Sequence, residues 1–393
     1  MRFLMPLILI LLLSGCRPSD VLVNIQRDID SIVNKWVPDQ REGICILNLS
    51  MLTGRKVLLK GETNIPEART EIINYFVNSG FEYSDSLLII PDTTEINKAW
   101  GLVSLSVCNI KKSPSHSSEL VSQAIMGTPV RILKKRGGWL LVQTPDSYIG
   151  WTNSSGIVEL NEKEIINWKR SERVIFIRKS GDILIEAGSD RVLSDIVSGA
   201  ILEVKGKKNS YYEVMLPDGR KGVLNKTDIS DFKQWLDVVF PDADMLIIFS
   251  KTLLGSPYLW GGTSTKAFDC SGFIKTIYFT SGIILARDAS LQFLYGKPIE
   301  YPSLFDSLKK GDLIFFGYNN EGKKRITHVG MYIGDTEVIH CSGMVRINSL
   351  DSTRPNFSKY LKDSMMGVKR IIVTEPGKGV ERIASHNWYQ FPD

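Results

Sequence analysis

The chain has 393 residues, of which 43% are hydrophobic and 23% charged, and its formal net charge is +5 at pH 7. This length predicts two to four domains, and the composition is that of a globular protein. The small positive charge is not gathered into a basic tract, so nothing in it indicates a nucleic-acid partner.

The N-terminus predicts a signal for export. One Arg is followed by an apolar run over residues 4–13, and the segment ends in LLSGC at Cys16. The run is too short for a membrane span and fits the apolar core of a signal peptide. LLSGC resembles a bacterial lipobox, which implies a signal peptide of residues 1–15 and a lipidated Cys16. We therefore expect an exported protein anchored to a bacterial membrane, in the periplasm or at the cell surface. The alternative is an ordinary signal peptide without lipid.

Residues 16–100 predict a small α+β unit. Apolar residues recur at near-helical spacing over residues 21–36, and a second helix is expected from Pro66 to Gly80. Strands are expected in GICILNLS, RKVLLKGE and SLLIIPD, the first two around a turn at residues 52–54. No chemistry is evident in this unit.

Residues 101–165 and 166–232 repeat one pattern of short strands. The segments GTPVRILKKRGGWLLVQTPDSYIGW and GAILEVKGKKNSYYEVMLPDGRKGV both run strand, basic turn, aromatic, strand, Pro-Asp turn and strand. Such a repeat predicts two copies of one small β-barrel. Both copies resemble bacterial SH3-like domains, which often bind cell-wall components. The second copy lacks an aromatic residue at the position of Trp151, so wall binding is not expected of it.

Residues 233–375 form the last predicted domain, and residues 376–393 are expected to be a polar tail on the surface with a solvated His386. In KAFDCSGFIKTIYF, Cys270 stands where a polar stretch changes into helical apolar spacing. A helix N-terminus favours a thiolate, so Cys270 is a candidate nucleophile with a lowered pKa. The alternative is a small buried residue that starts a core helix.

His328 and His340 lie on two predicted strands of a hairpin, RITHVGMYIGDTEVIHCSG. A strict two-residue loop puts the two rings on opposite faces of the hairpin, whereas an odd loop or a single bulge puts them on the same face. On one face they suit a Cys-His pair in which His328 is the base and His340 orients it. The alternatives are two structural histidines or a metal site. Two His residues without a third ligand make a poor zinc site, so no metal or cofactor is expected.

Four motifs, FDCSGFI, GDLIFF, THVGMYIGD and VIHCSG, resemble in this order the NlpC-type family of papain-like cysteine peptidases, which cleave peptides of the bacterial cell wall. The resemblance implies an α+β multidomain protein whose catalytic domain packs a Cys-bearing helix on an antiparallel sheet. It assigns Cys270 as nucleophile, His328 as base and His340 as third polar residue. It also places Tyr258, in PYLWGGTSTKAFDCSG, on the oxyanion side of the site.

The whole arrangement resembles γ-D-glutamyl-L-diamino-acid endopeptidases of the dipeptidyl-peptidase VI type. These enzymes act on freed murein stem peptides with a free N-terminal L-Ala, and their first SH3-like domain reads the amine. The resemblance implies that Glu119 and Tyr148 of that domain bind substrate. It also implies that Ser290 lies beyond the catalytic helix, and that Asp269 and Ser271 bind the amine and the γ-glutamyl carboxylate.

Several of these residues also suit a purely structural role. Asp269 also suits a helix cap, and Glu119 also suits a solvated loop charge. Cys45, Cys108 and Cys341 are expected to be packing thiols. At the level of function, the alternatives are an endopeptidase that remodels intact peptidoglycan and a catalytically inactive cell-wall-binding lipoprotein.

Overall fold

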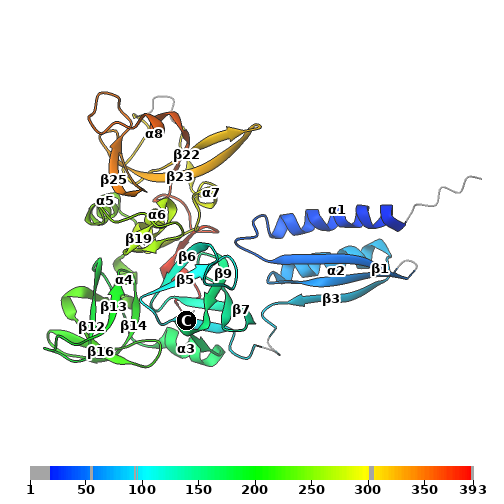
Figure 1. The fold of residues 1–393 in the computed structure, drawn as a ribbon, viewed down its shortest axis with the longest axis horizontal. Helices are drawn as coiled ribbons and strands as arrows, with labels where there is room; N and C mark the ends of the chain where they lie inside the picture. Colours follow the sequence, from blue (N-terminus) through cyan, green and yellow to red (C-terminus); the bar gives the residue numbers. More distant parts are fainter. Residues whose placement is uncertain (1–17, 54–55, 93, 95, 301–304, 391–393) are drawn as a thin grey trace, which may run out of the picture. The chain divides into compact units, whose positions relative to one another are not determined.

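The computed structural model describes residues 18–393 except 54–55, 93, 95, 301–304 and 391–393. Cys16 therefore lies outside the described residues. The chain divides into two compact units, Met1–Ile90 and Pro91–Asp393, which are coloured in sequence order in Figure 1. Within the described ranges no helix is both long and apolar enough to cross a membrane.

The first unit packs two helices on a three-stranded sheet. Strand β1 is antiparallel to β2, and β2 is parallel to β3. Helix α2 has a Pro in its first turn and ends at Gly80, whose φ of 70° is left-handed, as its sequence predicted. Ile29, Leu59 and Ile72 meet in the core. The elements are α1(Pro18–Trp36), β1(Cys45–Thr53), β2(Lys56–Thr63), α2(Pro66–Ser79) and β3(Tyr83–Ile89).

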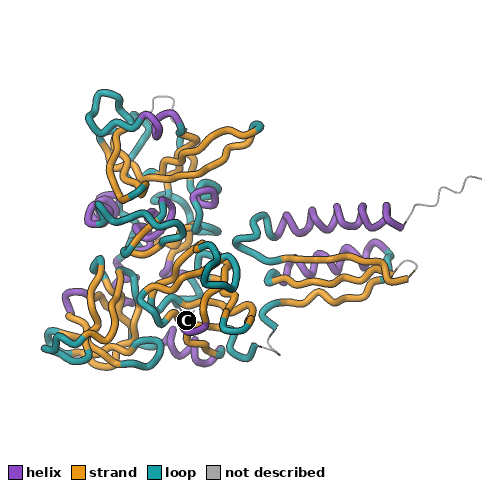
Figure 2. The backbone as a smooth tube through the Cα atoms, in the orientation of Figure 1, coloured by secondary structure: helices purple, strands orange, loops and turns teal. Residues whose placement is uncertain are grey.

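The second unit begins with two seven-stranded barrels of the same design. The strand order is β10-β4-β7-β8-β9-β5-β6 in the first barrel, and β17-β11-β14-β15-β16-β12-β13 in the second, read in the equivalent direction. Each strand of one barrel therefore has a counterpart in the other, which is the structural basis of the repeat in the sequence. Figure 2 shows the two barrels as separate groups of strands.

The strands of the first barrel are β4(Trp100–Val103), β5(Val107–Lys111), β6(Leu120–Ile125), β7(Pro129–Arg136), β8(Trp139–Gln143), β9(Ile149–Asn153) and β10(Ile157–Leu160). Helix α3(Glu162–Arg170) follows and begins at a capping box of Asn161 and Glu164. The strands of the second are β11(Arg173–Phe176), β12(Ser180–Leu184), β13(Val192–Val197), β14(Ile201–Lys207), β15(Tyr211–Met215), β16(Lys221–Asn225) and β17(Ile229–Asp231). Short 3-10 turns are η1(Ser154–Gly156), η2(Lys226–Asp228) and η3(Ile383–Ser385).

The last domain packs helix α6(Cys270–Phe279) against a six-stranded sheet of order β21-β26-β22-β23-β24-β25. Phe273 and Ile277 of the helix share one core with Val329 and Met331 of β23. The sheet strands are β21(Lys297–Pro298), β22(Leu313–Asn320), β23(Lys323–Gly334), β24(Glu337–Ser342), β25(Met344–Ser349) and β26(Met365–Arg370). The remaining elements are α4(Phe232–Val238), α5(Ala243–Thr252), β18(Thr263–Ser264), β19(Ala267–Phe268), β20(Ile283–Leu285), α7(Ala289–Gln292), α8(Lys359–Asp363) and β27(Val380–Arg382).

The C-terminal segment corrects one prediction from the sequence. Residues 376–390 are not a surface extension, because β27 pairs with β20 of the last domain and Tyr389 is only 1% exposed. His386 is buried rather than solvated, and its Nε2 lies 3.1 Å from the carbonyl oxygen of Pro145 in the first barrel. The polar composition of the segment was misleading, because Trp388 and Tyr389 supply enough apolar surface to join a core shared by both barrels.

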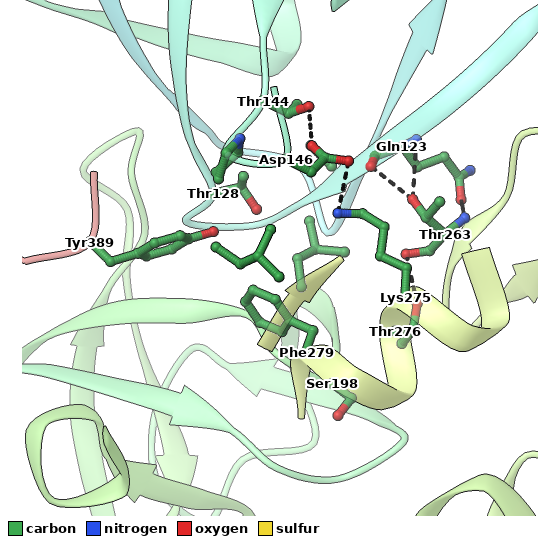
Figure 3. Close-up of a pocket in the computed structure, with 14 residues that line it drawn as sticks. Gln123, Thr128, Thr144, Asp146, Ser198, Thr263, Lys275, Thr276, Phe279 and Tyr389 are labelled. Carbon is green, nitrogen blue, oxygen red and sulfur yellow. Dashed lines mark hydrogen bonds and ion pairs between the residues drawn. The ribbon is translucent and has the colours of Figure 1, made fainter. Parts of the chain in front are cut away.

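A polar seam fixes the first barrel to the last domain. Figure 3 shows Asp146 of the barrel pointing at Lys275 of α6, with an Oδ2–Nζ distance of 2.9 Å, beside a cavity of about 60 Å³. Burial raises the pKa of Asp146, but the charge of Lys275 and hydrogen bonds from Thr144 and Lys275 lower it by more. Gln123 and Thr263 exchange hydrogen bonds across the same seam. The barrel is therefore held at one position relative to α6.

Candidate active site

Cys270 is the first residue of α6. Its helix is capped by Asp269, whose Oδ1 accepts the N–H of Gly272 at 2.7 Å. The Cys270 sulfur accepts hydrogen bonds from the backbone N–H groups of Ser271 and Val329. Because Val329 directly follows His328, the second bond puts the sulfur beside the backbone of the predicted base.

The thiol is not acidified, contrary to the expectation from the helix N-terminus. Burial, followed by the negative charge of Asp269, raises the pKa of Cys270 to about 11, outweighing the two N–H groups and Arg287. Burial, followed by the charge of His340, lowers the pKa of His328 to about 3. At neutral pH the resting pair is therefore a neutral thiol and a neutral imidazole, because Cys270 is only 7% exposed and little water is available to stabilise a thiolate.

A single bulge decides the register of the histidine hairpin. The turn at Asp335 and Thr336 has only two residues, both with positive φ, but the pairing shifts between Tyr332 and Gly334, so Gly330 lies opposite His340. His328 and His340 consequently share a face, and Nε2 of His328 lies 2.9 Å from Nδ1 of His340. Gly330 permits this pairing, since a Cβ there would lie 2.6 Å from the Val338 side chain.

Asn348 of β25 completes a relay that fixes the tautomers of both rings. Its Nδ2 donates to the carbonyl oxygen of Asn356 at 3.0 Å, so its Oδ1 faces Nε2 of His340, also at 3.0 Å. The Nε2 of His340 must therefore carry its proton, and the Nδ1 of His340 accepts from Nε2–H of His328. The remaining nitrogen, Nδ1 of His328, is unprotonated and free to accept the thiol proton. The sequence reasoning missed Asn348, which lies outside the four motifs.

Tyr258 lies in the loop before α6. Its backbone N–H donates to the Gly343 carbonyl at 2.9 Å. Burial, and next the charge that a Cys270 thiolate would carry, raises the pKa of Tyr258 to about 12. The phenol therefore keeps its proton at neutral pH and is a hydrogen-bond donor close to the nucleophile. Its predicted role on the oxyanion side stays a prediction.

A buried arginine connects Asp269, which caps the helix that begins at Cys270, to the first barrel. Arg287, 1% exposed, pairs through Nη2 with Oδ2 of Asp269 at 2.5 Å and donates through Nη1 to Ser271 Oγ at 3.1 Å. Its Nε donates to Ser122 Oγ of β6 at 3.2 Å. Asp269 also accepts the N–H of Gly261 at 3.1 Å, so the predicted substrate ligands Asp269 and Ser271 belong to one hydrogen-bonded network. Arg287 is not among the site residues that the sequence predicts.

The first barrel reaches the site through Glu119. Its Oε1 accepts the indole N–H of Trp260 at 2.9 Å, and its Oε2 lies 3.3 Å from Lys112 Nζ. Glu119 is therefore not a free loop charge. Gly261, with φ of +78°, lets the two domains touch here, since a Cβ would lie 2.5 Å from the Leu120 carbonyl oxygen.

The other two predicted ligands are Tyr148, just before β9, and Ser290, on α7. Tyr148 is buried against Ala286 and Leu291. Burial lowers the pKa of Arg287, but Asp269, Asp288 and the Tyr148 phenol together raise it above its ordinary value. Ser290 is half-buried on the short helix α7.

The other cysteines that the structure describes are buried and reduced. Cys45, Cys108 and Cys341 make no disulfide, and the thiol of Cys341 donates to the Phe268 carbonyl at 3.4 Å. Over the part of the chain that the structure describes, no three His, Cys, Asp or Glu side chains are grouped to hold a metal ion.

The pKa values predict how Cys270 reacts with iodoacetamide. Only the thiolate reacts, so its alkylation rate should rise about tenfold per pH unit between about pH 6 and pH 9 without reaching a plateau. Mass spectrometry of the Cys270 peptide measures this rate, and a Cys270→Ala variant gives the background of the other thiols. A rate that is constant above pH 5 would instead reveal a thiolate–imidazolium pair.

Comparisons with known proteins agree with this geometry. The NlpC/P60 family model matches residues 255–370, and a model described as the bacterial dipeptidyl-peptidase Sh3 domain matches residues 110–157. A γ-D-glutamyl-L-lysine dipeptidyl-peptidase from Bacillus cereus is 34% identical over 64% of this chain and 76% of its own length. A protein of the same description from Bacillus subtilis is 30% identical, over 56% and 71%.

A solved structure shares the architecture as well. An NlpC/P60 family protein from Bacillus cereus superposes with a TM-score of 0.60 at 26% identity, over 70% of this chain and 99% of that one. The similarity thus extends beyond the catalytic domain into the barrels that precede it.

Proposed function

Because the chain belongs to the NlpC/P60 family of cysteine peptidases, we propose that it hydrolyses the γ-D-glutamyl–diamino acid bond of murein stem peptides with a free N-terminal L-Ala. One observation supports this choice within the family. The first barrel brings the carboxylate of Glu119 onto Trp260, in the loop that leads to Cys270. A carboxylate at the acyl end suits an α-ammonium group through a charge-assisted hydrogen bond.

The chemistry begins with the neutral pair. The Cys270 sulfur attacks the γ-carbonyl carbon of D-Glu while its proton moves to Nδ1 of His328. Negative charge develops on the carbonyl oxygen, where the phenol of Tyr258 and the backbone N–H at the start of α6 are the available donors. The relay through His340 and Asn348 holds the imidazolium in place.

The intermediate then collapses toward the leaving group. His328 returns the proton to the leaving α-amine of the diamino acid, and the C–N bond breaks to leave a thioester on Cys270. Water attacks this thioester with His328 as the base, which releases L-Ala-γ-D-Glu and restores the thiol. Ser271 and Arg287 belong to the polar network beside the nucleophile, which suits the α-carboxylate of D-Glu.

The test compares L-Ala-γ-D-Glu-L-Lys with its N-acetyl form. We expect the free-amine peptide to be preferred about 100-fold in kcat/KM, since a charge-assisted hydrogen bond contributes about 1.5–3 kcal/mol. Glu119→Gln should remove most of that preference. Glu159→Gln, on the same barrel but paired with Lys135, is the matched control and should keep it.

Two other outcomes would favour the alternative functions. Equal cleavage of both peptides would favour an endopeptidase that remodels intact peptidoglycan and would remove the amine-reading role of Glu119. No cleavage of either peptide, with the Cys270→Ala background subtracted, would favour a wall-binding protein without this activity.

The proposal includes export and a lipid anchor. The apolar run over residues 4–13 and the LLSGC sequence support cleavage before Cys16 and its lipidation. An anchored enzyme of this kind would meet murein peptides outside the cytoplasm. The mass of the mature N-terminal peptide tests this proposal, because a lipid adds a fixed increment to Cys16.

A further inference from the structure

A polar pocket opens beside the histidine pair, and neither Glu119 nor Trp260 lines it. It has a volume of about 360 Å³ and is lined by both catalytic histidines, by Arg346 and Asn348 of β25, and by residues around α8. Among these are the hydroxyl groups of Ser342, Ser358 and Tyr360. It shares no lining residue with the network of Asp269, Ser271 and Arg287.

Arg346 gives this pocket a positive charge. It lies directly opposite His340 in the β24–β25 pairing, so both side chains stand on one face of the sheet. Arg346 is exposed, and among the described residues no carboxylate lies within ion-pair distance of it. Its charge lowers the pKa of His340, after the larger effect of burial. A cation at this position opposes the imidazolium that the reaction must form, so it does not serve proton transfer by itself.

The proposed mechanism determines which half of the substrate lies in this pocket. The leaving amine must receive its proton from His328, so the diamino acid lies on the histidine side of Cys270. The acyl half must extend the other way, toward Glu119 and the Asp269 network. The α-carboxylate of the leaving residue is attached next to the scissile nitrogen and therefore points close to the histidines.

We propose that this pocket holds the leaving diamino acid and that Arg346 binds its α-carboxylate. This inference rests on the proposed function and adds a specificity determinant to it. The carboxylate neutralises Arg346 when substrate binds, which relieves its opposition to the imidazolium during the reaction. Phe357 and the exposed ring of Tyr360 offer the aliphatic stem of the diamino acid an apolar surface.

The test uses three substrates that share the acyl half. They are L-Ala-γ-D-Glu-L-Lys, its C-terminal carboxamide, and L-Ala-γ-D-Glu p-nitroanilide, whose leaving group has no carboxylate. We expect the wild type to prefer the free acid over the carboxamide about 10- to 100-fold in kcat/KM. Arg346→Gln should bring this ratio close to one, and Arg346→Lys should keep part of it.

Controls separate the binding role from a general defect. Arg346→Gln should cleave the anilide at least as fast as the wild type, because this substrate has no carboxylate to lose and the charge that opposes the imidazolium is gone; this result would show that the fold and the chemistry are intact. Arg382→Gln, an exposed arginine on β27, should keep the wild-type ratio. A wild-type ratio near one, or an unchanged ratio in Arg346→Gln, would overturn the role of Arg346 while cleavage of the anilide preserved the proposed function. Failure of the wild type to cleave any of the three would overturn both.

Discussion

Substituting His328 with alanine should lower kcat by about 10⁴-fold, and substituting Asn348 with alanine should lower it by about 10- to 100-fold. In the proposed mechanism His328 takes and returns the proton, so nothing replaces it. Asn348 acts indirectly, because its 3.0 Å contact holds the proton on Nε2 of His340. Without it the rings are free to adopt the tautomer in which Nδ1 of His328 is protonated and is no longer a base.

Asn348→Asp distinguishes this tautomer effect from loss of packing. Aspartate still accepts from Nε2 of His340, so it should retain more activity than alanine, and its charge should raise the acid limb of the kcat/KM profile to higher pH. Steady-state kinetics between about pH 4 and pH 9 measure both effects. A wild-type kcat in Asn348→Ala, or a change confined to KM, would show that Asn348 does not position the histidines.

Replacing Arg287 with methionine should lower the free energy of unfolding by about 3–5 kcal/mol, because it leaves the buried carboxylate of Asp269 without a partner. The expected loss is large because the guanidinium is 1% exposed and bonds to Asp269, Ser271 and Ser122 together. Urea unfolding followed by tryptophan fluorescence measures it.

Two variants make this result specific. The double variant Asp269→Asn with Arg287→Met should recover part of the lost stability, since no unpaired charge then remains buried. Arg370→Met breaks the pair of Arg370 with the buried Asp312, at 2.7 Å, in the same domain. It should destabilise the protein while leaving the kcat of the folded fraction unchanged. If Arg287→Met is as stable as the wild type, the network is not a structural link between the domains.

The sequence was most informative where a pattern is local. The repeat in residues 101–232 predicted two barrels, and the structure has them with equivalent strand order. The Cys270 helix start and the histidine hairpin were also visible as short motifs. Family comparison supports the fold, the peptidase class and the predicted substrate class.

Features that depend on distant contacts were not predictable in the same way. The sequence left two hairpin registers open, and one bulge near Gly334 decided between them. Asn348 and Arg287 matter because of partners far along the chain, which no local spacing reveals. The sign of the Cys270 pKa shift was wrong because a helix terminus is visible in sequence, whereas the degree of burial of the sulfur is not.

The contact at Gly261 has a consequence for how such enzymes diversify. In the proposed mechanism the residues that break the bond belong to one domain, and the group that reads the substrate's free end belongs to another. The two domains meet at Gly261, a backbone position that accommodates no side chain. Selection can therefore alter which peptides are accepted by changing the barrel, without touching the nucleophile or its histidines. Substrate choice and bond cleavage can then change independently, although both belong to a single polypeptide.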